Sequence, residues 1–190
     1  MKETRLTEIR AEATADAKTL ILRGRAIVFD TPTVINDVCG SYTEVIRSGA
    51  LDGCDLSDVR LLYNHDTNKV PLARTPKTMR LTLSAAGLDF EAELPNTDEA
   101  KGVYESVKRG DLSGCSFAMV VPDGGDSYDA ATNTRTIYHI TKILECSVVP
   151  FPAYPTTSVE ARSARAESQK SYKAKQQVII TCNKILIKEV

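Results

Sequence analysis

Two short stretches near the middle of the chain alternate between apolar and polar residues. The apolar positions are Met79, Leu81 and Leu83 in the first stretch, and Leu88, Phe90, Ala92 and Leu94 in the second. Alternation with a period of two is typical of β-strands, in which every second side chain points to the same face. The intervening Ala85-Ala86-Gly87 is short enough to form a turn. The pattern therefore predicts a β-hairpin over residues 79–94.

The pattern becomes helical directly after this hairpin. Pro95-Asn96-Thr97-Asp98-Glu99 offers a capping residue and acidic side chains for a first helical turn. The apolar residues that follow have the spacing i, i+3, i+4, i+7, and they are Ala100, Val103, Tyr104 and Val107. Lys108 and Arg109, followed by Gly110, are typical of the end of a helix. We expect one amphipathic helix here.

Apolar runs elsewhere predict further strands. They cover residues 20–29, 59–64, 115–121 and, as one long β-rich run, 136–149. The run at 59–64 ends directly before His65, which therefore lies at the junction between a strand and the polar loop that begins with Asp66. Residues 122–133 are rich in Gly and Asp and are expected to form a loop, whereas residues 41–51 give no clear pattern.

Changes in composition divide the chain into three parts. We expect a polar leader at 1–19, a compact domain at 20–157 that ends in the proline cluster of residues 150–155, and a basic tail at 158–190. The tail has seven Lys and Arg residues against three Glu, a local excess of four positive charges. Its Ala-, Ser- and Lys-rich first half predicts a mobile or weakly helical segment that is a candidate for processing. The role of residues 178–190 is left open.

The composition of the chain makes several classes of function unfavourable. The chain has 190 residues, of which 42% are hydrophobic, and a formal net charge of -1, so nothing favours nonspecific binding to nucleic acid or to anionic membranes. No signal-like segment opens the chain, and no apolar stretch is long enough to span a bilayer. Five scattered cysteines and two histidines predict no metal site and indicate a reducing compartment, with the cytoplasm as the expected location. No Gly-rich phosphate-binding loop follows a strand, so no cofactor is expected.

Nucleophilic catalysis is the chemistry that the sequence leaves open. His65 is the stronger candidate for a general base, because a strand end beside a loop positions a side chain and leaves it reachable. His139 lies inside a predicted strand and is expected to be structural or a surface residue. The segment 111–119 places Ser113, Cys115 and Ser116 around Gly114 at a transition from loop to strand. Glycine there lets the backbone approach a substrate closely.

Four segments carry a resemblance in the same order along the chain: Asn64-His65-Asp66, the hairpin end at 87–95, Gly110-Asp111-Leu112-Ser113-Gly114-Cys115-Ser116-Phe117, and the stretch from Leu144-Glu145-Cys146-Ser147 to Pro155. Together they resemble the prohead (capsid maturation) proteases of tailed bacteriophages. The resemblance covers residues 20–157 in the same order. It implies an α+β fold similar to herpesvirus assemblin, namely a mostly antiparallel β-barrel flanked by helices.

The resemblance also implies the roles of three residues. Ser116 would be the nucleophile, His65 its general base, and Glu145 the acidic third member. The family commonly has glycine near the aromatic end of the serine strand, whereas this chain has Ser116-Phe117-Ala118-Met119. The departure affects the expected shape of that strand and not the choice of nucleophile.

Several alternatives stay open beside this assignment. Asp66 adjoins His65 and could hardly reach the far ring nitrogen, so a distant carboxylate is the better orienting group. His139 competes with Glu145 as the third member; in a straight strand the two would lie roughly 20 Å apart, so only one can contact His65. Cys115 points to the opposite face from Ser116 and is the alternative nucleophile. Cys146 is expected in the core.

The resulting hypothesis is a serine endopeptidase that acts inside the procapsid in the bacterial host cytoplasm. Its expected partners are the major capsid protein with its scaffolding segment and, through self-cleavage, its own chain. The sequence leaves open whether the protein forms a homo-oligomer, which cleavage sites it prefers, and whether it comes from a phage or a prophage. The alternative is a non-catalytic capsid-assembly or scaffold-like protein, whose basic tail docks on acidic partners. A third interpretation is an esterase or amidase that uses the same three residues.

Overall fold

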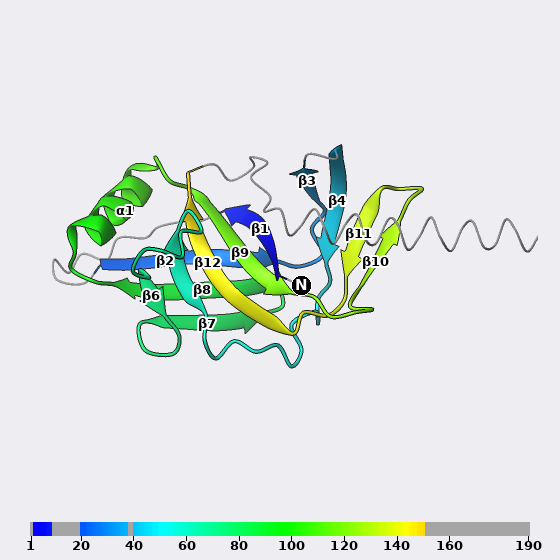
Figure 1. Ribbon diagram of the computed structural model, residues 1–190, viewed down its shortest axis with the longest axis horizontal. Coiled ribbons are helices and arrows are strands. Elements are labelled where there is room, and N and C mark those ends of the chain that lie inside the picture. The colour runs from blue at the N-terminus through cyan, green and yellow to red at the C-terminus, as the bar shows by residue number, and fades with distance from the viewer. Residues whose placement is uncertain (1, 9–19, 38–39, 151–190) are drawn as a thin grey trace, which may run out of the picture.

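The protein is described by a computed structural model that covers residues 2–8, 20–37 and 40–150 (Figure 1). Within these residues the chain forms twelve β-strands, grouped in three sheets, and one α-helix. The fold is therefore mostly β-sheet. Figure 1 shows the helix at one end of the molecule and the four-stranded sheet at the other, with the two remaining sheets between them.

The largest sheet has five strands in the order β1-β9-β12-β5-β6. Their bounds are Lys2–Glu8 for β1, Gly114–Val120 for β9, Lys142–Val149 for β12, Arg60–Tyr63 for β5 and Ala73–Arg74 for β6. β12 pairs antiparallel with β9 on one side and parallel with β5 on the other. The predicted strands at 59–64 and 115–121 are confirmed as β5 and β9. Residues 2–8, expected to be part of a polar leader, pair with β9 along its full length.

The second sheet contains the predicted hairpin. Its order is β2-β8-β7, with bounds Leu20–Val28 for β2, Gly87–Leu94 for β8 and Met79–Ser84 for β7. Ser84 pairs with Gly87, so the turn consists of Ala85 and Ala86. A glycine is required at 87 because its φ is +149° and a Cβ there would lie 1.8 Å from the carbonyl oxygen of Ile27. The hairpin and the strand at 20–29 are thus confirmed, although Leu83 is 48% exposed at the hairpin's end.

The predicted helix is α1, Asp98–Arg109. The Thr97 hydroxyl caps its N-terminus by accepting a hydrogen bond from the amide of Ala100. Gly110 ends the helix with a left-handed φ of 84°, and its amide bonds back to carbonyls of the last turn. The buried face consists of the four residues that the spacing predicted: Ala100, Val103, Tyr104 and Val107.

The third sheet overturns two predictions. Its order is β10-β11-β4-β3, with bounds Asp126–Asp129 for β10, Thr134–Ile137 for β11, Gly40–Ile46 for β4 and Thr33–Asp37 for β3. The long strand expected at 136–149 is wrong: it is two strands in different sheets, β11 and β12, which residues 138–141 connect. The expected loop at 122–133 contains β10.

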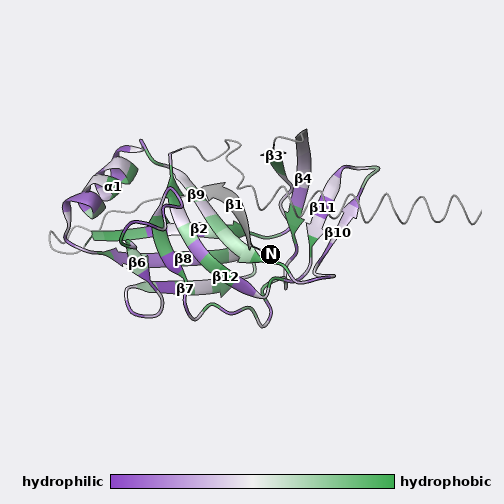
Figure 2. Cartoon of the chain, viewed as in Figure 1, coloured by the Kyte–Doolittle hydropathy of each residue, from purple (hydrophilic) through white to green (hydrophobic). Residues whose placement is uncertain are grey.

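One hydrophobic core joins the five-stranded sheet, the three-stranded sheet and the helix. It includes Leu22 and Ile27 of β2, Phe90 of β8, Val103 of α1 and Phe117 of β9. Figure 2 shows hydrophobic positions along the strands of these two sheets, whereas β10 is mostly hydrophilic. β1 lies close to β2, and β6 lies close to β8, so both edge strands of the five-stranded sheet lie close to the three-stranded sheet. In the described part of the chain, strand pairing closes no barrel, and one helix is found where the resemblance implies several.

The predictions for residues 158–190 and for the end of the proline cluster fall outside the described residues, which stop at position 150. No helix within the described ranges is long and apolar enough to cross a membrane.

Candidate active site

Ser116 lies on the face of the five-stranded sheet that points away from the core. In the pairing of β9 with β12, Ser116 stands directly opposite Ser147. Side chains that oppose each other in an antiparallel pair share a face, with Cβ atoms about 4.5–5.5 Å apart. The neighbours of Ser116 on β9, Cys115 and Phe117, pack in the core cluster. The alternation along β9 therefore separates the hydroxyl of Ser116 from the thiol of Cys115.

A β-bulge in β12 brings Glu145 to the same face. Ile143 pairs with Met119, but the next pair along the ladder is Glu145 with Ala118, so Leu144 is an extra residue. Regular pairing after Ile143 would place Glu145 opposite Phe117, whose side chain is in the core. Because of the bulge, Glu145 instead shares the face of Ser147 and Ser116.

His65 reaches this face through a left-handed turn at the end of β5. Asn64 and His65 both have positive φ values, 53° and 59°. Asn is well tolerated in this conformation, and His is enriched there as well. The amide of Asn64 donates to the carbonyl of Val148 at 2.9 Å, which continues the pairing with β12. The next amide, that of His65, donates to Oγ of Ser147 at 3.2 Å. The turn therefore returns the chain toward β12 instead of leading it away.

The imidazole of His65 contacts the carboxylate of Glu145. Nδ1 of His65 lies 2.8 Å from Oε1 of Glu145. The Glu145 side chain is 5% exposed and that of His65 is 29% exposed, so the pair extends from the interior toward solvent. A carboxylate on Nδ1 fixes the orientation of the ring and leaves Nε2 to exchange a proton with a hydroxyl.

The second oxygen of Glu145 is bound as well. Oγ of Ser147 donates to Oε2 of Glu145 at 2.5 Å. Sequence reasoning missed Ser147 as a functional residue. The available signal was its spacing of two from Glu145, which puts both side chains on one face of a strand.

Ser116 itself is fully buried, with 0% exposure. In the described part of the chain, its Oγ has no hydrogen-bond partner. The structure therefore brings His65 and Glu145 into contact and places Ser116 on their face of the sheet, but it shows no hydrogen bond between Ser116 and His65. A buried hydroxyl without a partner is costly, and a catalytic role is one explanation for such a group.

Cys115 and Cys146 lack the environment of a nucleophile. Cys115 is fully buried on the core face, where its Sγ donates to the carbonyl of Ser116. Burial raises the pKa of Cys146 well above its usual value, and the nearby Cys115 and Glu145 raise this pKa further. A thiol that stays protonated is a poor nucleophile. The placement of Cys146 in the core is confirmed.

His139 and Asp66 have other surroundings. His139 is exposed in the connection between β11 and β12, where its amide donates to the carbonyl of Gly125, so the expectation of a strand interior is wrong. The expected separation of His139 and Glu145 assumed one straight strand, which the structure does not contain. Asp66 accepts a hydrogen bond from the amide of Asn68 and so caps its own loop.

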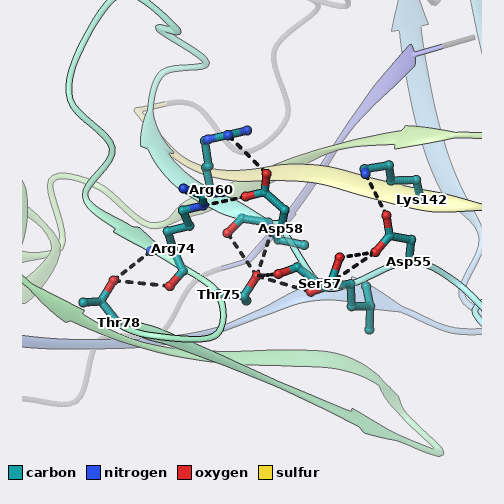
Figure 3. Close-up of polar contacts among 10 residues, drawn as sticks. Asp55, Ser57, Asp58, Arg60, Arg74, Thr75, Thr78 and Lys142 are labelled. Carbon is teal, nitrogen blue, oxygen red and sulfur yellow. Dashed lines mark hydrogen bonds and ion pairs between the residues drawn. The ribbon is translucent and has the colours of Figure 1, made fainter.

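A separate polar cluster lies at the start of β5, at the opposite end of the strand from His65 (Figure 3). Asp58 contacts Arg74 at 2.6 Å and Arg60 at 3.2 Å. The hydroxyl of the buried Thr75 accepts from the amide of Val59 at 2.8 Å and donates to nearby carbonyls. These contacts hold β5 against β6.

Lys142 and Asp55 extend the same cluster to β12 (Figure 3). Nζ of Lys142 lies 2.6 Å from Oδ2 of Asp55. This hydrogen bond, with further ones from Ser57, holds the pKa of Asp55 below its usual range. The described residues contain no group of three or more His, Cys, Asp or Glu side chains that could hold a metal ion.

Comparisons with known proteins show the family through a sequence profile and a similar fold through a solved structure. The sequence profile of the caudovirus prohead serine proteases matches residues 6–173. Among solved structures, the capsid assembly protease of bacteriophage T4, gp21, has a similar fold: the TM-score is 0.50 at 9% sequence identity, and the match covers 80% of this chain and 98% of that one. No curated protein sequence matches the chain. The profile match spans most of the sequence, and the chain therefore belongs to the prohead serine protease family of the caudoviruses, the tailed phages.

Proposed function

We propose that this serine protease is an endopeptidase that cleaves the scaffolding segments of capsid proteins, and its own chain, inside the phage procapsid in the cytoplasm of the bacterial host. The observation that carries the proposal is the contact between His65 and Glu145 on the sheet face that also bears Ser116. Membership of the prohead serine protease family supports the substrate class, and the T4 protein of similar fold is itself a capsid assembly protease. Digestion of a scaffold inside a closed shell would make maturation irreversible.

The proposed mechanism proceeds through an acyl-enzyme. Nε2 of His65 takes the proton of Ser116 as Oγ attacks the peptide carbonyl carbon, and the same nitrogen then gives that proton to the leaving amine. Water, deprotonated by His65, releases the acyl group and restores Ser116. Glu145 holds the ring through Nδ1 and stabilises the imidazolium that forms in each step.

The burial of Ser116 adds a step before chemistry. A substrate carbonyl must come within bonding distance of Oγ, and that atom has no exposure to solvent. We therefore propose that a local opening of the site exposes Ser116 and lets it reach His65. The hydroxyl gives up no hydrogen bond within the described residues when it moves, which lowers the cost of the step.

Two finer proposals extend the same assignment. The approach of β1 to β2 and of β6 to β8 supports a barrel-like arrangement of the five-stranded and three-stranded sheets, as the resemblance implies. The segment at 158–190 is the proposed site of self-cleavage, because its sequence is polar and basic, a composition that predicts a segment open to proteolysis. Terminal mass analysis of the active protein and of Ser116→Ala tests this, and identical C-termini would contradict it.

The decisive experiment incubates the purified chain with its co-encoded capsid protein. We expect fragments with the wild type and none with Ser116→Ala, because loss of a serine nucleophile costs on the order of 10⁶-fold in kcat. Ser113→Ala is the matched control, since Ser113 is exposed just before β9, and it should cleave normally.

Three other results would reject the proposal. Cleavage by Ser116→Ala would exclude Ser116 as the nucleophile. Salt-sensitive binding to capsid subunits without cleavage would favour the scaffold-like alternative. Turnover of small esters without cleavage of protein would favour the esterase interpretation.

A further inference from the structure

One buried hydroxyl connects two members of the proposed triad. Oγ of Ser147 donates its proton to Oε2 of Glu145 and accepts the amide proton of His65. Ser147 is fully buried and directly opposite Ser116. Its side chain therefore contacts the acidic member and the backbone of the base, and it borders the nucleophile.

We propose that Ser147 is a positioning residue that holds the carboxylate of Glu145 and the turn of His65 in a fixed relation to each other. This inference rests on the proposed function, because it takes Glu145 as the group that orients His65. Ser147 has one hydroxyl proton, which goes to Glu145, and it acts on the reaction only through its two neighbours.

The local geometry makes this hydroxyl hard to replace. In the described part of the chain, the Glu145 carboxylate has two hydrogen bonds, one to His65 and one to Ser147. Without Ser147, Oε2 would lose its donor inside the protein, and the carboxylate could rotate about its remaining contact. A buried charged group that loses a partner is strongly destabilised.

The contact with the His65 amide supports the same conclusion. His65 has a positive φ, a conformation that residues other than glycine adopt only when their surroundings hold them. The Ser147 hydroxyl is the acceptor for the amide of this residue. Loss of that acceptor would allow the turn to relax and the ring to move away from β12.

Steady-state cleavage of a capsid-derived peptide by Ser147→Ala and Ser147→Thr tests the proposal. We expect Ser147→Ala to lower kcat by about 10- to 100-fold, the loss typical of one hydrogen bond to a charged group, with KM changed less than about threefold. Ser147→Thr keeps the hydroxyl, and its kcat should be at least about tenfold higher than that of Ser147→Ala. If Ser147→Ala does not fold, Ser147→Cys, which keeps the shape with a weaker donor, takes its place.

Thr75→Val is the matched control for loss of a buried hydroxyl. Thr75 binds backbone groups at the far end of β5 and contacts no proposed catalytic residue. We expect Thr75→Val to lower the melting temperature but to leave kcat unchanged. An equal loss of kcat in Thr75→Val and Ser147→Ala would reduce Ser147 to a structural role.

A spectroscopic measurement reports on the contact itself. The chain has two histidines, so ¹⁵N-labelled histidine gives signals that His139→Gln assigns. A proton on Nδ1 that is bound to a carboxylate should appear far downfield and be protected from exchange. We expect this signal for His65 in the wild type and in Thr75→Val, and its loss or broadening in Ser147→Ala.

The outcomes separate this inference from the proposed function. Cleavage by Ser116→Ala would reject the mechanism, while the histidine signal would still show whether Ser147 orders His65. An inactive Ser116→Ala, together with a Ser147→Ala that matches the wild type in kcat and in the histidine signal, would reject the positioning role alone. A Ser147→Thr no faster than Ser147→Ala would also overturn it, and a fluorophosphonate adduct on Ser147 would overturn both.

Discussion

Nδ1 of His65 and Oε1 of Glu145 lie 2.8 Å apart, although 80 positions separate the two residues in the chain. Neither residue is placed by its own element alone. The bulge in β12 directs Glu145 away from the core, and the left-handed turn after β5 directs His65 toward β12. In the proposed mechanism, this contact would set the ring orientation of the base before a substrate arrives.

Glu145→Gln should impair the chemical step and not binding. The amide keeps the shape of the side chain but cannot stabilise an imidazolium, so we expect kcat to fall by about 10²- to 10⁴-fold. The upper value, about 10⁴-fold, is the loss seen when the triad aspartate of a serine protease is changed to asparagine. Steady-state kinetics on a capsid-derived peptide provides the measurement. Glu93→Gln, at an exposed position of β8, should match the wild type. Full activity of Glu145→Gln would show that another group orients His65.

The burial of Ser116 predicts an unusual dependence on reagent concentration. A fluorophosphonate must wait for the site to open, so we expect its rate of reaction with Ser116 to reach a ceiling set by opening. Intact mass against time, for two reagents of different size, measures this rate. The ceiling should be the same for both reagents. Rates that rise in proportion to concentration throughout would show that the hydroxyl is already accessible.

Cys54 and Cys146 should be unreactive in the folded protein. Burial raises the pKa of Cys54 to about 11, and it raises the pKa of Cys146 well above the usual value, so both thiols stay protonated at about pH 8. Peptide mapping after treatment with iodoacetamide should show little modification of either residue unless the protein is unfolded in urea. Proteolysis should be unaffected by the reagent. Inactivation that tracks with an adduct on Cys115 would revive the thiol mechanism.

Two glycine-to-alanine changes should shift stability in opposite directions. Gly87→Ala forces a Cβ against the carbonyl of Ile27 at a positive φ, and we expect a loss of about 3 kcal/mol or more in the free energy of unfolding. Gly102→Ala adds a methyl group with no atom within 4 Å in an exposed position of α1, and should gain up to about 1 kcal/mol. Urea denaturation measures both. A stable Gly87→Ala would mean that the hairpin can shift away from β2.

Local signals in the sequence were sufficient for some elements. The hairpin of β7 and β8 follows from alternation over a few residues, and α1 follows from its apolar spacing and its caps at Thr97 and Gly110. The strand end that bears His65 was predicted for the same reason. Such signals act between near neighbours in the chain, so a single sequence displays them.

Features that depend on distant pairing were not predicted. The run at 136–149 has strand-like composition throughout, and the change of sheet at 138–141 follows from the pairing of β11 with β4 and of β12 with β9. Ser147 drew no attention because a serine in a strand has no signature of its own. Its importance emerges only when β5 and β12 lie side by side and bring the His65 amide to its hydroxyl.

The bulge in β12 has a consequence for how related chains can vary in length. Leu144 is the surplus residue, so deleting it would leave Ile143 facing the core and Glu145 facing His65, as they do now. Removal of Cys146, which lies between Glu145 and Ser147, would instead turn one of these two side chains to the opposite side of the sheet. Natural deletions in this strand should therefore be found at position 144 and be absent from the three residues after it.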